Sequence, residues 1–282
     1  MRLLPLSEAI ATHVRDGQSV ALEGFTHLIP FAAAHEIIRQ RRRGLHLIRM
    51  TPDLIYDQLI GMGCAERLTF SWGGNPGVGS LHRVRDAIER QWPQPLAVSE
   101  FTHAEMALAY QAGASGLPCA LMRYYAGSDL MRVPGAQVKT VHCPFTGATL
   151  AAVPAITPDV TILHAQQIDA TGNVLIHGIL GAAKEAAMAA RCVLVTVEEQ
   201  VETLRADMNA IVLPSWLIAA ASIVPGGAYP SYAQGCYARD NAFYQQWDDI
   251  ARDRDSFAAW MQRHVLGVRD HAALLHTLGV AA

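Results

Sequence analysis

The chain has 282 residues, of which 51% are hydrophobic and 17% charged, a balance typical of a globular protein and not of a disordered one. Its 22 basic and 25 acidic residues give a net charge of −3 with no basic half or tail, which argues against nucleic acid or an anionic membrane as a partner. The longest apolar run, residues 211–224, is interrupted by Pro214 and is shorter than the roughly 20 residues that cross a bilayer. Five scattered cysteines, and an N-terminus without an apolar signal core, predict a reduced cytoplasmic protein without a metal centre.

The first part of the chain alternates between helical and strand patterns. Ser7 is expected to cap a helix through Val14, and a turn at Asp16-Gly17 leads into a buried strand over residues 19–22. The segments that follow are predicted as a helix over 30–41, a strand over 45–50, a helix over 53–60, a strand over 68–72 and a helix over 80–91.

The alternation continues with a helix over 104–112, a strand over 159–164, a helix over 182–190 and a strand over 192–197. This order predicts an α/β fold, an open and mostly parallel sheet covered by helices. From residue 229 the chain becomes aromatic, polar and helical, with Trp247 and Trp260. We therefore expect an α/β domain over residues 1–228 and a C-terminal helical extension over residues 229–282, packed on the same domain.

Two glycine-containing loops, residues 23–27 and 71–75, each follow a predicted strand. In open parallel sheets, ligands bind beyond the carboxyl ends of the strands, and glycine lets backbone N–H groups approach an anion closely. Neither loop matches a nucleotide-binding fingerprint. The alternative to a binding role is an ordinary turn.

Thr102, His103 and Glu105 follow another predicted strand. Thr102 and Glu105 have the spacing of a capping box, so a structural role for Glu105 is favoured over a catalytic one. His103 would start the helix and lie near any ligand at the sheet edge. Glu23 precedes Gly24 and could be a buried carboxylate, and the chain contains no Gly-x-Ser-x-Gly nucleophile elbow.

A family resemblance follows from the segment Asp-Gly-Gln-Ser-Val-Ala-Leu-Glu-Gly-Phe-Thr-His-Leu-Ile-Pro, residues 16–30. It is similar to the signature of the A (alpha) subunits of family I coenzyme A transferases, in the branch of the 3-oxoadipate and glutaconate enzymes. Glu23 replaces the first glycine of that signature, and Pro30 stands earlier than usual. Further similar segments are residues 49–54, 71–77, 112–118, 125–130, 164–165, 172–173, 196–199 and 224–228.

This resemblance implies the family I fold and a ping-pong reaction in which CoA passes from succinyl-CoA to 3-oxoadipate, in aromatic-compound breakdown. A glutamate attacks the acyl-CoA thioester, and the CoA thiolate returns to form a glutamyl-CoA thioester. In the family that glutamate lies on the B subunit, in a Ser-Glu-Asn-Gly motif that this chain lacks. The resemblance thus implies an A/B hetero-oligomer with two copies of each subunit, acyl-CoA and dicarboxylate substrates, and no cofactor besides CoA as substrate carrier.

The resemblance also suggests which residues form this chain's half of the site. His103 is a candidate for stabilising the oxyanion. Glu23, His27 and Glu105 are further candidates. Substrate or CoA binding is expected at Gly24, Phe25, Thr26, Ser71, Gly73, Gly74 and Asn75.

Three other functions remain open at this point. Two are enzymes of the same fold, a glutaconate-type CoA-transferase subunit and an acyl-CoA hydrolase that releases free acid without an acceptor. The third is a sugar-phosphate sensor, for which a basic N-terminal helix-turn-helix is expected. The first strand, predicted near Ser19, leaves no room for that motif.

Overall fold

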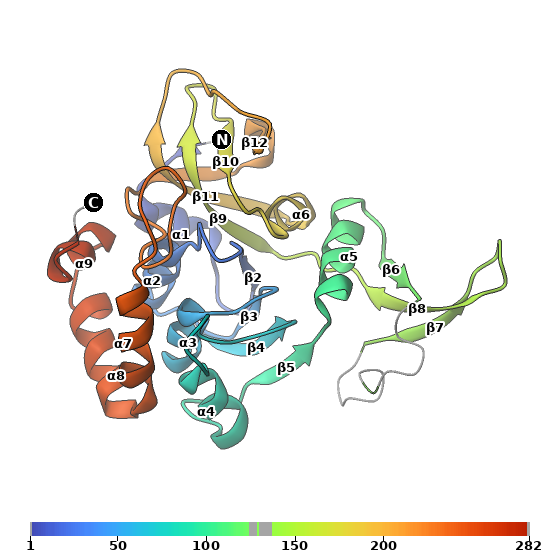
Figure 1. Cartoon of the computed structure of the whole chain (residues 1–282), viewed down its shortest axis with the longest axis horizontal. Coiled ribbons are helices and arrows are strands. Elements are labelled where there is room, and N and C mark those ends of the chain that lie inside the picture. The colour runs from blue at the N-terminus through green and yellow to red at the C-terminus, as the bar shows by residue number, and fades with distance from the viewer. Residues whose placement is uncertain (1, 124–128, 130–136, 281–282) are drawn as a thin grey trace.

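The computed structural model describes residues 2–123, 129 and 137–280, and a sheet of parallel strands lies at its centre (Figure 1). Of the resemblance segments, residues 125–128 and 130 lie outside the described part. Among the described residues, ten strands share this sheet, and the path β1-β13-β11-β9-β2-β3-β4-β5 is parallel throughout. The predicted open, mostly parallel sheet is confirmed.

Along the chain the strands of this path are β1 Arg2–Leu3, β2 Ser19–Leu22, β3 Leu45–Ile48, β4 Ala65–Phe70, β5 Ala97–Glu100, β9 Val160–Ile168, β11 Cys192–Gln200 and β13 Ala220–Ile223. The antiparallel strands β10 (Val174–His177) and β12 (Ala210–Leu213) branch from β9.

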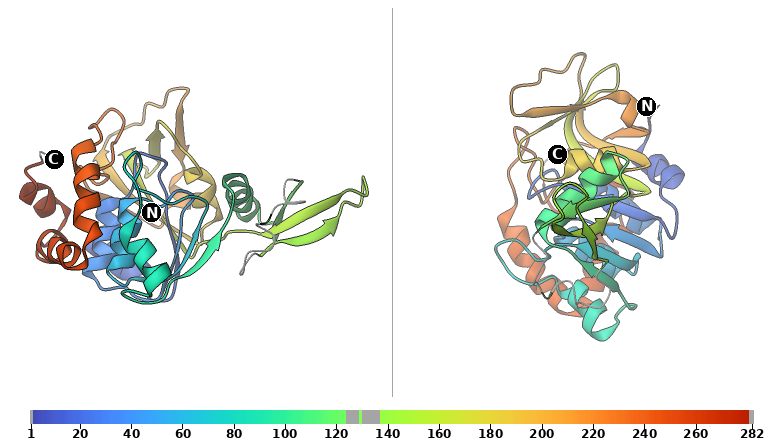
Figure 2. Two further views of the ribbon diagram at one scale, coloured as in Figure 1. Left: turned by 60° about the horizontal axis from the view of Figure 1, so that its bottom comes forward. Right: turned by 90° about the vertical axis from the view of Figure 1, so that its right-hand side faces the viewer.

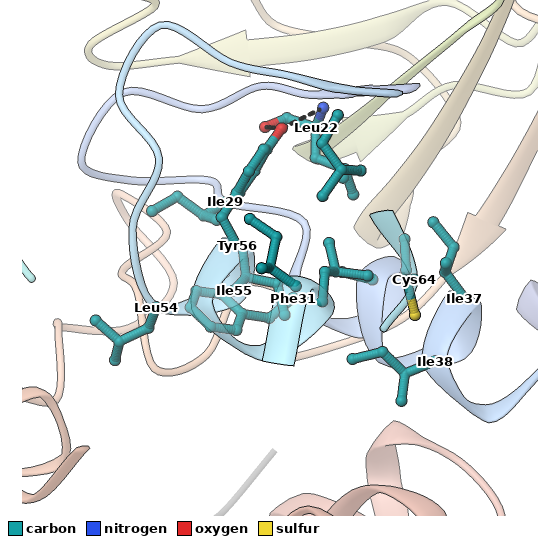
Figure 3. Close-up of a cluster of buried hydrophobic side chains, with 14 of the residues drawn as sticks. Leu22, Ile29, Phe31, Ile37, Ile38, Leu54, Ile55, Tyr56 and Cys64 are labelled. Atoms are coloured by element: carbon teal, nitrogen blue, oxygen red, sulfur yellow. Dashed lines mark hydrogen bonds between the residues drawn. The ribbon is translucent and has the colours of Figure 1, made fainter. Parts of the chain in front are cut away.

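Helices cover both faces of the sheet because successive side chains of each strand point to opposite faces. In β2, Val20 and Leu22 belong to the core that contains α1–α4, whereas Ala21 belongs to a second core with α5 and α6. Figure 3 shows Leu22 beside α2 and α3, where the Tyr56 hydroxyl accepts a hydrogen bond from the Leu22 N–H at 3.2 Å. The helices are α1 Leu6–His13, α2 Phe31–Arg39, α3 Leu54–Gly61, α4 His82–Arg90, α5 His103–Ala114, α6 Ala183–Ala189, α7 Asn241–Arg252, α8 Arg254–Met261 and α9 His271–Thr277, with the short 3-10 and π segments η2 Ser215–Leu217 and η3 Gln262–Leu266.

The start of the first helix differs from the prediction. Helix α1 begins at Leu6 with Pro5 in the cap position, so the predicted Ser7 cap is wrong. The Pro5 carbonyl accepts hydrogen bonds from the N–H groups of Glu8 and Ala9, both at 3.0 Å. Proline, which has no N–H of its own to satisfy, suits the beginning of a helix, and the hydroxyl of Ser7 is not required.

A small antiparallel sheet was not predicted. Strands β6 (Cys119–Met122), β8 (Thr149–Pro154) and β7 (Lys139–His142) pair in that order and extend away from the body of the molecule (Figures 1 and 2). Three of the four β7 residues are exposed, and the sequence there has no apolar alternation that would indicate a strand.

The C-terminal extension packs on the helices that precede it in the chain. Trp247 of α7 is buried and its indole N–H donates to the Asp57 carboxylate of α3 at 3.2 Å. The same carboxylate accepts from the N–H groups of Arg83 and Val84 at 2.7 and 3.0 Å, at the start of α4. One buried group thus joins α3, α4 and α7.

Candidate functional site

The loops predicted to bind substrate lie together at one edge of the sheet. The 24–28 loop follows β2, residues 49–53 follow β3, the 71–75 loop follows β4, and Thr102 precedes α5 directly after β5. Since these four strands are parallel neighbours, their carboxyl ends meet at the same edge.

The 24–28 loop has an unusual backbone. Thr26 and Leu28 adopt positive φ angles of 63° and 52°, the left-handed region that side chains other than glycine rarely occupy. A Cβ atom on Gly24 would lie 2.7 Å from the Leu28 carbonyl oxygen and 2.8 Å from that of His27. The loop folds back on itself so tightly that only glycine fits at position 24.

Glu23 is buried beneath this loop and connects three elements. Its Oε1 accepts hydrogen bonds from the Tyr110 hydroxyl of α5 at 2.8 Å and from the Met50 N–H at 3.4 Å. Burial raises the pKa of Glu23, and the nearby Arg49 guanidinium only partly opposes that rise. Arg49 itself donates to the Gly24 carbonyl at 2.7 Å and pairs with Asp53 at 2.9 Å.

The 71–75 loop is fastened at both ends. The Ser71 hydroxyl donates to the Met50 carbonyl at 2.7 Å, and the buried Asn75 amide donates to the Tyr244 carbonyl of α7 at the same distance. A Cβ on Gly74 would lie 2.7 Å from the Trp72 ring, whereas Gly73 is exposed. Ser71 and Gly73 therefore stand nearer to solvent at the sheet edge than Gly74 and Asn75.

The capping box at the start of α5 is confirmed. The Thr102 hydroxyl accepts from the Glu105 N–H at 3.1 Å, and the Glu105 carboxylate accepts from the Thr102 N–H at 3.0 Å. Glu105 is buried in this arrangement, while His103 is exposed on the first turn of the helix. His103 is therefore accessible to a ligand, whereas the Glu105 side chain is buried.

A pocket of about 590 Å³ opens beside His103 and brings it together with Phe25. Its wall includes one face of α5, on which residues spaced by four (His103, Ala107 and Gln111) follow one another. The spacing of these three residues is visible in the sequence and is the signal that marks this helix face. The complete lining is Phe25, Met50, His103, Ala104, Ala107, Leu108, Gln111, Gly181, Ala182 and Glu185.

His27 does not line this pocket. It is buried, and its Nε2 donates to the His177 carbonyl at 3.1 Å. A Cβ on Gly178 would lie 2.3 Å from that nitrogen, so glycine permits the contact. Burial lowers the pKa of His27. The structure thus places Phe25 and His103 at the pocket, and Glu23, His27 and Glu105 in buried hydrogen bonds.

Two further properties concern the described part of the chain as a whole. No three or more His, Cys, Asp or Glu side chains there are arranged to hold a metal ion. Among the same residues, no helix is both long and apolar enough to cross a membrane. All five cysteines are free thiols.

A parallel sheet with glycine-containing loops at its carboxyl edge and a mostly apolar pocket beside them is the arrangement in which open α/β enzymes bind their ligands. The family model of coenzyme A transferases matches residues 4–221, and the chain belongs to this enzyme family. This membership favours an enzyme over a sugar-phosphate sensor.

Two curated relatives indicate which members of the family the chain resembles. The chain is 61% identical to the A subunit of the 3-oxoadipate CoA-transferase of Pseudomonas knackmussii over 268 residues, covering 95% of both chains. It is 30% identical to the A subunit of the glutaconate CoA-transferase of Acidaminococcus fermentans, covering 99% of this chain and 92% of the relative.

Solved structures agree with the fold. The crystal structure of glutaconate coenzyme A-transferase from Acidaminococcus fermentans superposes with a TM-score of 0.92 at 29% identity, covering 99% of this chain and 93% of that one. The decarboxylase AibA/AibB superposes with a TM-score of 0.80 at 30% identity, covering 93% and 98%. The predicted family I fold is confirmed.

Proposed function

We propose that the chain is the A subunit of a 3-oxoadipate CoA-transferase, which moves CoA from succinyl-CoA to 3-oxoadipate with a B-type partner. The observation that carries this proposal is the 61% identity to a subunit of that name over 95% of both chains. Two copies of each subunit would form the enzyme. Cysteines without paired spacing suit a reducing compartment, so we place the reaction in the cytoplasm.

The surroundings of the two carboxylates at the sheet edge support a nucleophile that comes from the partner subunit. Glu23 is buried against Tyr110, and Glu105 is held in the capping box, so neither is arranged to attack a substrate. The nucleophilic glutamate would come from the partner subunit. It attacks the thioester carbonyl carbon, CoA leaves as the thiolate, and the thiolate then attacks the resulting anhydride to release succinate and form glutamyl-CoA.

This chain would supply the walls of the acyl pocket and a hydrogen-bond donor to the reacting carbonyl group. We assign His103 to the carbonyl oxygen on which negative charge develops, since its imidazole is exposed at the pocket. Phe25 and the α5 face would enclose the acyl chain. The surrounding loops would be shaped by Gly24, Thr26, Ser71, Gly73, Gly74 and Asn75. Glu23 and His27 would hold the 24–28 loop in place through their buried hydrogen bonds.

The test is co-expression with a B-type partner that carries the glutamate motif. We expect 3-oxoadipyl-CoA to form from succinyl-CoA only when both subunits are present, through a glutamyl-CoA adduct sensitive to borohydride or hydroxylamine. An assembled complex that forms no such adduct with acyl-CoA would refute the transferase proposal.

The same assay separates two related functions. A glutaconate-type enzyme, favoured by the TM-score of 0.92, would prefer glutaconate to 3-oxoadipate as acceptor. A hydrolase would release free acid without any acceptor. A hydrolase subunit that cleaves cholesterol rings in Rhodococcus jostii is 26% identical over 62% of this chain.

A further inference from the structure

Glu198, near the carboxyl end of β11, accepts hydrogen bonds from three different parts of the chain. Its Oε1 accepts from His164 Nε2 at 2.5 Å and from the Tyr237 hydroxyl at 2.7 Å, and its Oε2 accepts from the Gly226 N–H at 2.7 Å. His164 is on β9, whereas Gly226 and Tyr237 belong to the loop after β13. The carboxylate thus joins two strands to one loop.

The surroundings of Glu198 favour its charged form. Burial acts to raise its pKa, but the interactions with His164, Tyr237 and the Gly226 N–H together outweigh burial and lower the pKa below its ordinary value. His164 is fixed in turn, because its Nδ1 lies 2.8 Å from the Thr196 hydroxyl. A Cβ on Gly227 would lie 2.7 Å from the His164 ring, so the loop approaches as closely as glycine allows.

The loop that Glu198 fastens, residues 224–237, also contacts the 24–28 loop. The Leu28 N–H donates to the Tyr232 carbonyl at 2.9 Å, and the Ser231 hydroxyl donates to the Thr26 carbonyl at 3.1 Å. The rings of Tyr232 and His27 have centroids 4.9 Å apart.

These contacts fall on residues whose backbone is costly to hold. Thr26 and Leu28 have positive φ, and residues in such conformations persist only when their surroundings fix them. Phe25, next to Thr26, lies against Gly181 and lines the pocket. Loss of the contacts between residues 224–237 and the 24–28 loop would therefore allow Phe25 to leave its position at the pocket.

We propose that Glu198 is a positioning residue: by fastening residues 224–237 through Tyr237 and Gly226, it holds the 24–28 loop in the shape that places Phe25 at the pocket. Tyr237 transmits the constraint, since its hydroxyl accepts from the Ala228 N–H at 2.9 Å while donating to Glu198. The effect on catalysis rests on the proposed function, whereas the effect on the shape of the 24–28 loop does not depend on it.

The experiment compares Glu198→Gln and Tyr237→Phe with Glu199→Gln. Glu199 is the next residue of β11, so its side chain points to the other face of the sheet, where it is exposed and accepts from Gln167 at 2.7 Å. Hydrogen exchange is measured on the full chain, alone and in complex with the B-type partner. Steady-state kinetics are measured on the complex.

We expect the Leu28 amide to exchange at least about tenfold faster in both test variants, because its acceptor, the Tyr232 carbonyl, is no longer held. The kcat per folded complex should fall about tenfold or more, since small displacements at a reacting group are costly. Glu199→Gln should match the unaltered chain in both measurements.

Unchanged exchange at residues 24–28 in Tyr237→Phe would overturn the inference, even if the variant were less stable overall. So would faster exchange with unaltered kcat, because the loop would then not govern the pocket. An unaltered complex without transferase activity, combined with faster exchange in the variants, would reject the proposed function and leave the loop constraint in place.

Discussion

At the scale of single residues, a buried histidine links the stability of the fold to pH. His271, the first residue of α9, donates from Nε2 to the Gly226 carbonyl at 2.9 Å, which leaves Nδ1 buried without a hydrogen-bond partner. Burial lowers the pKa of His271 from 6.5 to about 4. The neutral imidazole is therefore the form that the fold accepts.

Substitution of His271 by Gln is expected to reduce the acid sensitivity of folding. The unfolded chain binds a proton at His271 below pH 6.5 but the folded chain does not do so until about pH 4, so stability is lost as the pH falls through this window. Between pH 6.5 and 5 the loss is about 1.5 kcal/mol. Urea unfolding at both pH values should show a loss smaller by about this amount in His271→Gln.

The control is His276→Gln, which changes an exposed histidine on the same helix. It should keep the acid sensitivity of the unaltered chain. Equal sensitivity in all three proteins would show that His271 does not titrate as its burial requires.

Gly24 is the second residue whose role can be tested alone. Gly24→Ala would bring a Cβ within 2.8 Å of two backbone carbonyl oxygens, so the 24–28 loop must move. We expect the transferase kcat of the A/B complex to fall at least about tenfold. Gly79→Ala adds the same methyl group with its nearest neighbour at 3.8 Å and should change the melting temperature little. Full activity in Gly24→Ala would contradict the proposed place of this loop in the site.

At the scale of elements, the sequence was informative where local chemistry decides the structure. Thr102 and Glu105 form the capping box that their spacing predicted, and the buried strands β2 and β3 lie within the predicted runs. Strands β9 and β11 begin in the predicted runs but extend beyond them, to Ile168 and Gln200. Ser7 was misplaced because backbone geometry at Pro5 begins the helix instead. The β6-β8-β7 sheet was missed because pairing between distant segments, and not local pattern, forms it.

The capping box offers a test at this scale. Thr102→Ala removes the acceptor for the Glu105 N–H and should lower the free energy of unfolding by about 1 kcal/mol, with faster exchange in the first turn of α5. Thr102→Ser keeps a hydroxyl and should lose much less. Equal stability of the two variants in urea titrations would mean that the cap contributes nothing.

At the scale of the whole molecule, the candidate site could be predicted only in part. The loops at the carboxyl edge were found because strand ends and glycines mark them in the sequence. His103 was assigned to the site, but Met50, the rest of the α5 face (Ala107 and Gln111) and the 181–185 segment were not, since their approach to Phe25 depends on how α5 and α6 pack. The burial of Glu23, His27 and Asn75 likewise follows from tertiary contacts.

We propose that residues 229–282 unfold together with residues 1–228, because one hydrophobic core contains side chains of both. Trp247→Phe removes the hydrogen bond to Asp57 and part of a buried ring, which should cost about 2 kcal/mol. Amide protection should fall equally in α3 and α7. Trp216→Phe, at a side chain that is 78% exposed, should change neither. Loss of protection in α7 alone would show that the extension unfolds separately.

The order of strands also bears on how the chain is made. Strand β2 pairs with β9, whose residues are synthesised about 140 positions later, so the N-terminal half cannot complete its sheet while it leaves the ribosome. At translation rates of about 5–20 residues per second, the uncovered edge of β2 waits on the order of ten seconds for its neighbour. Nascent chains of this protein are therefore expected to need protection from aggregation until β9 has emerged.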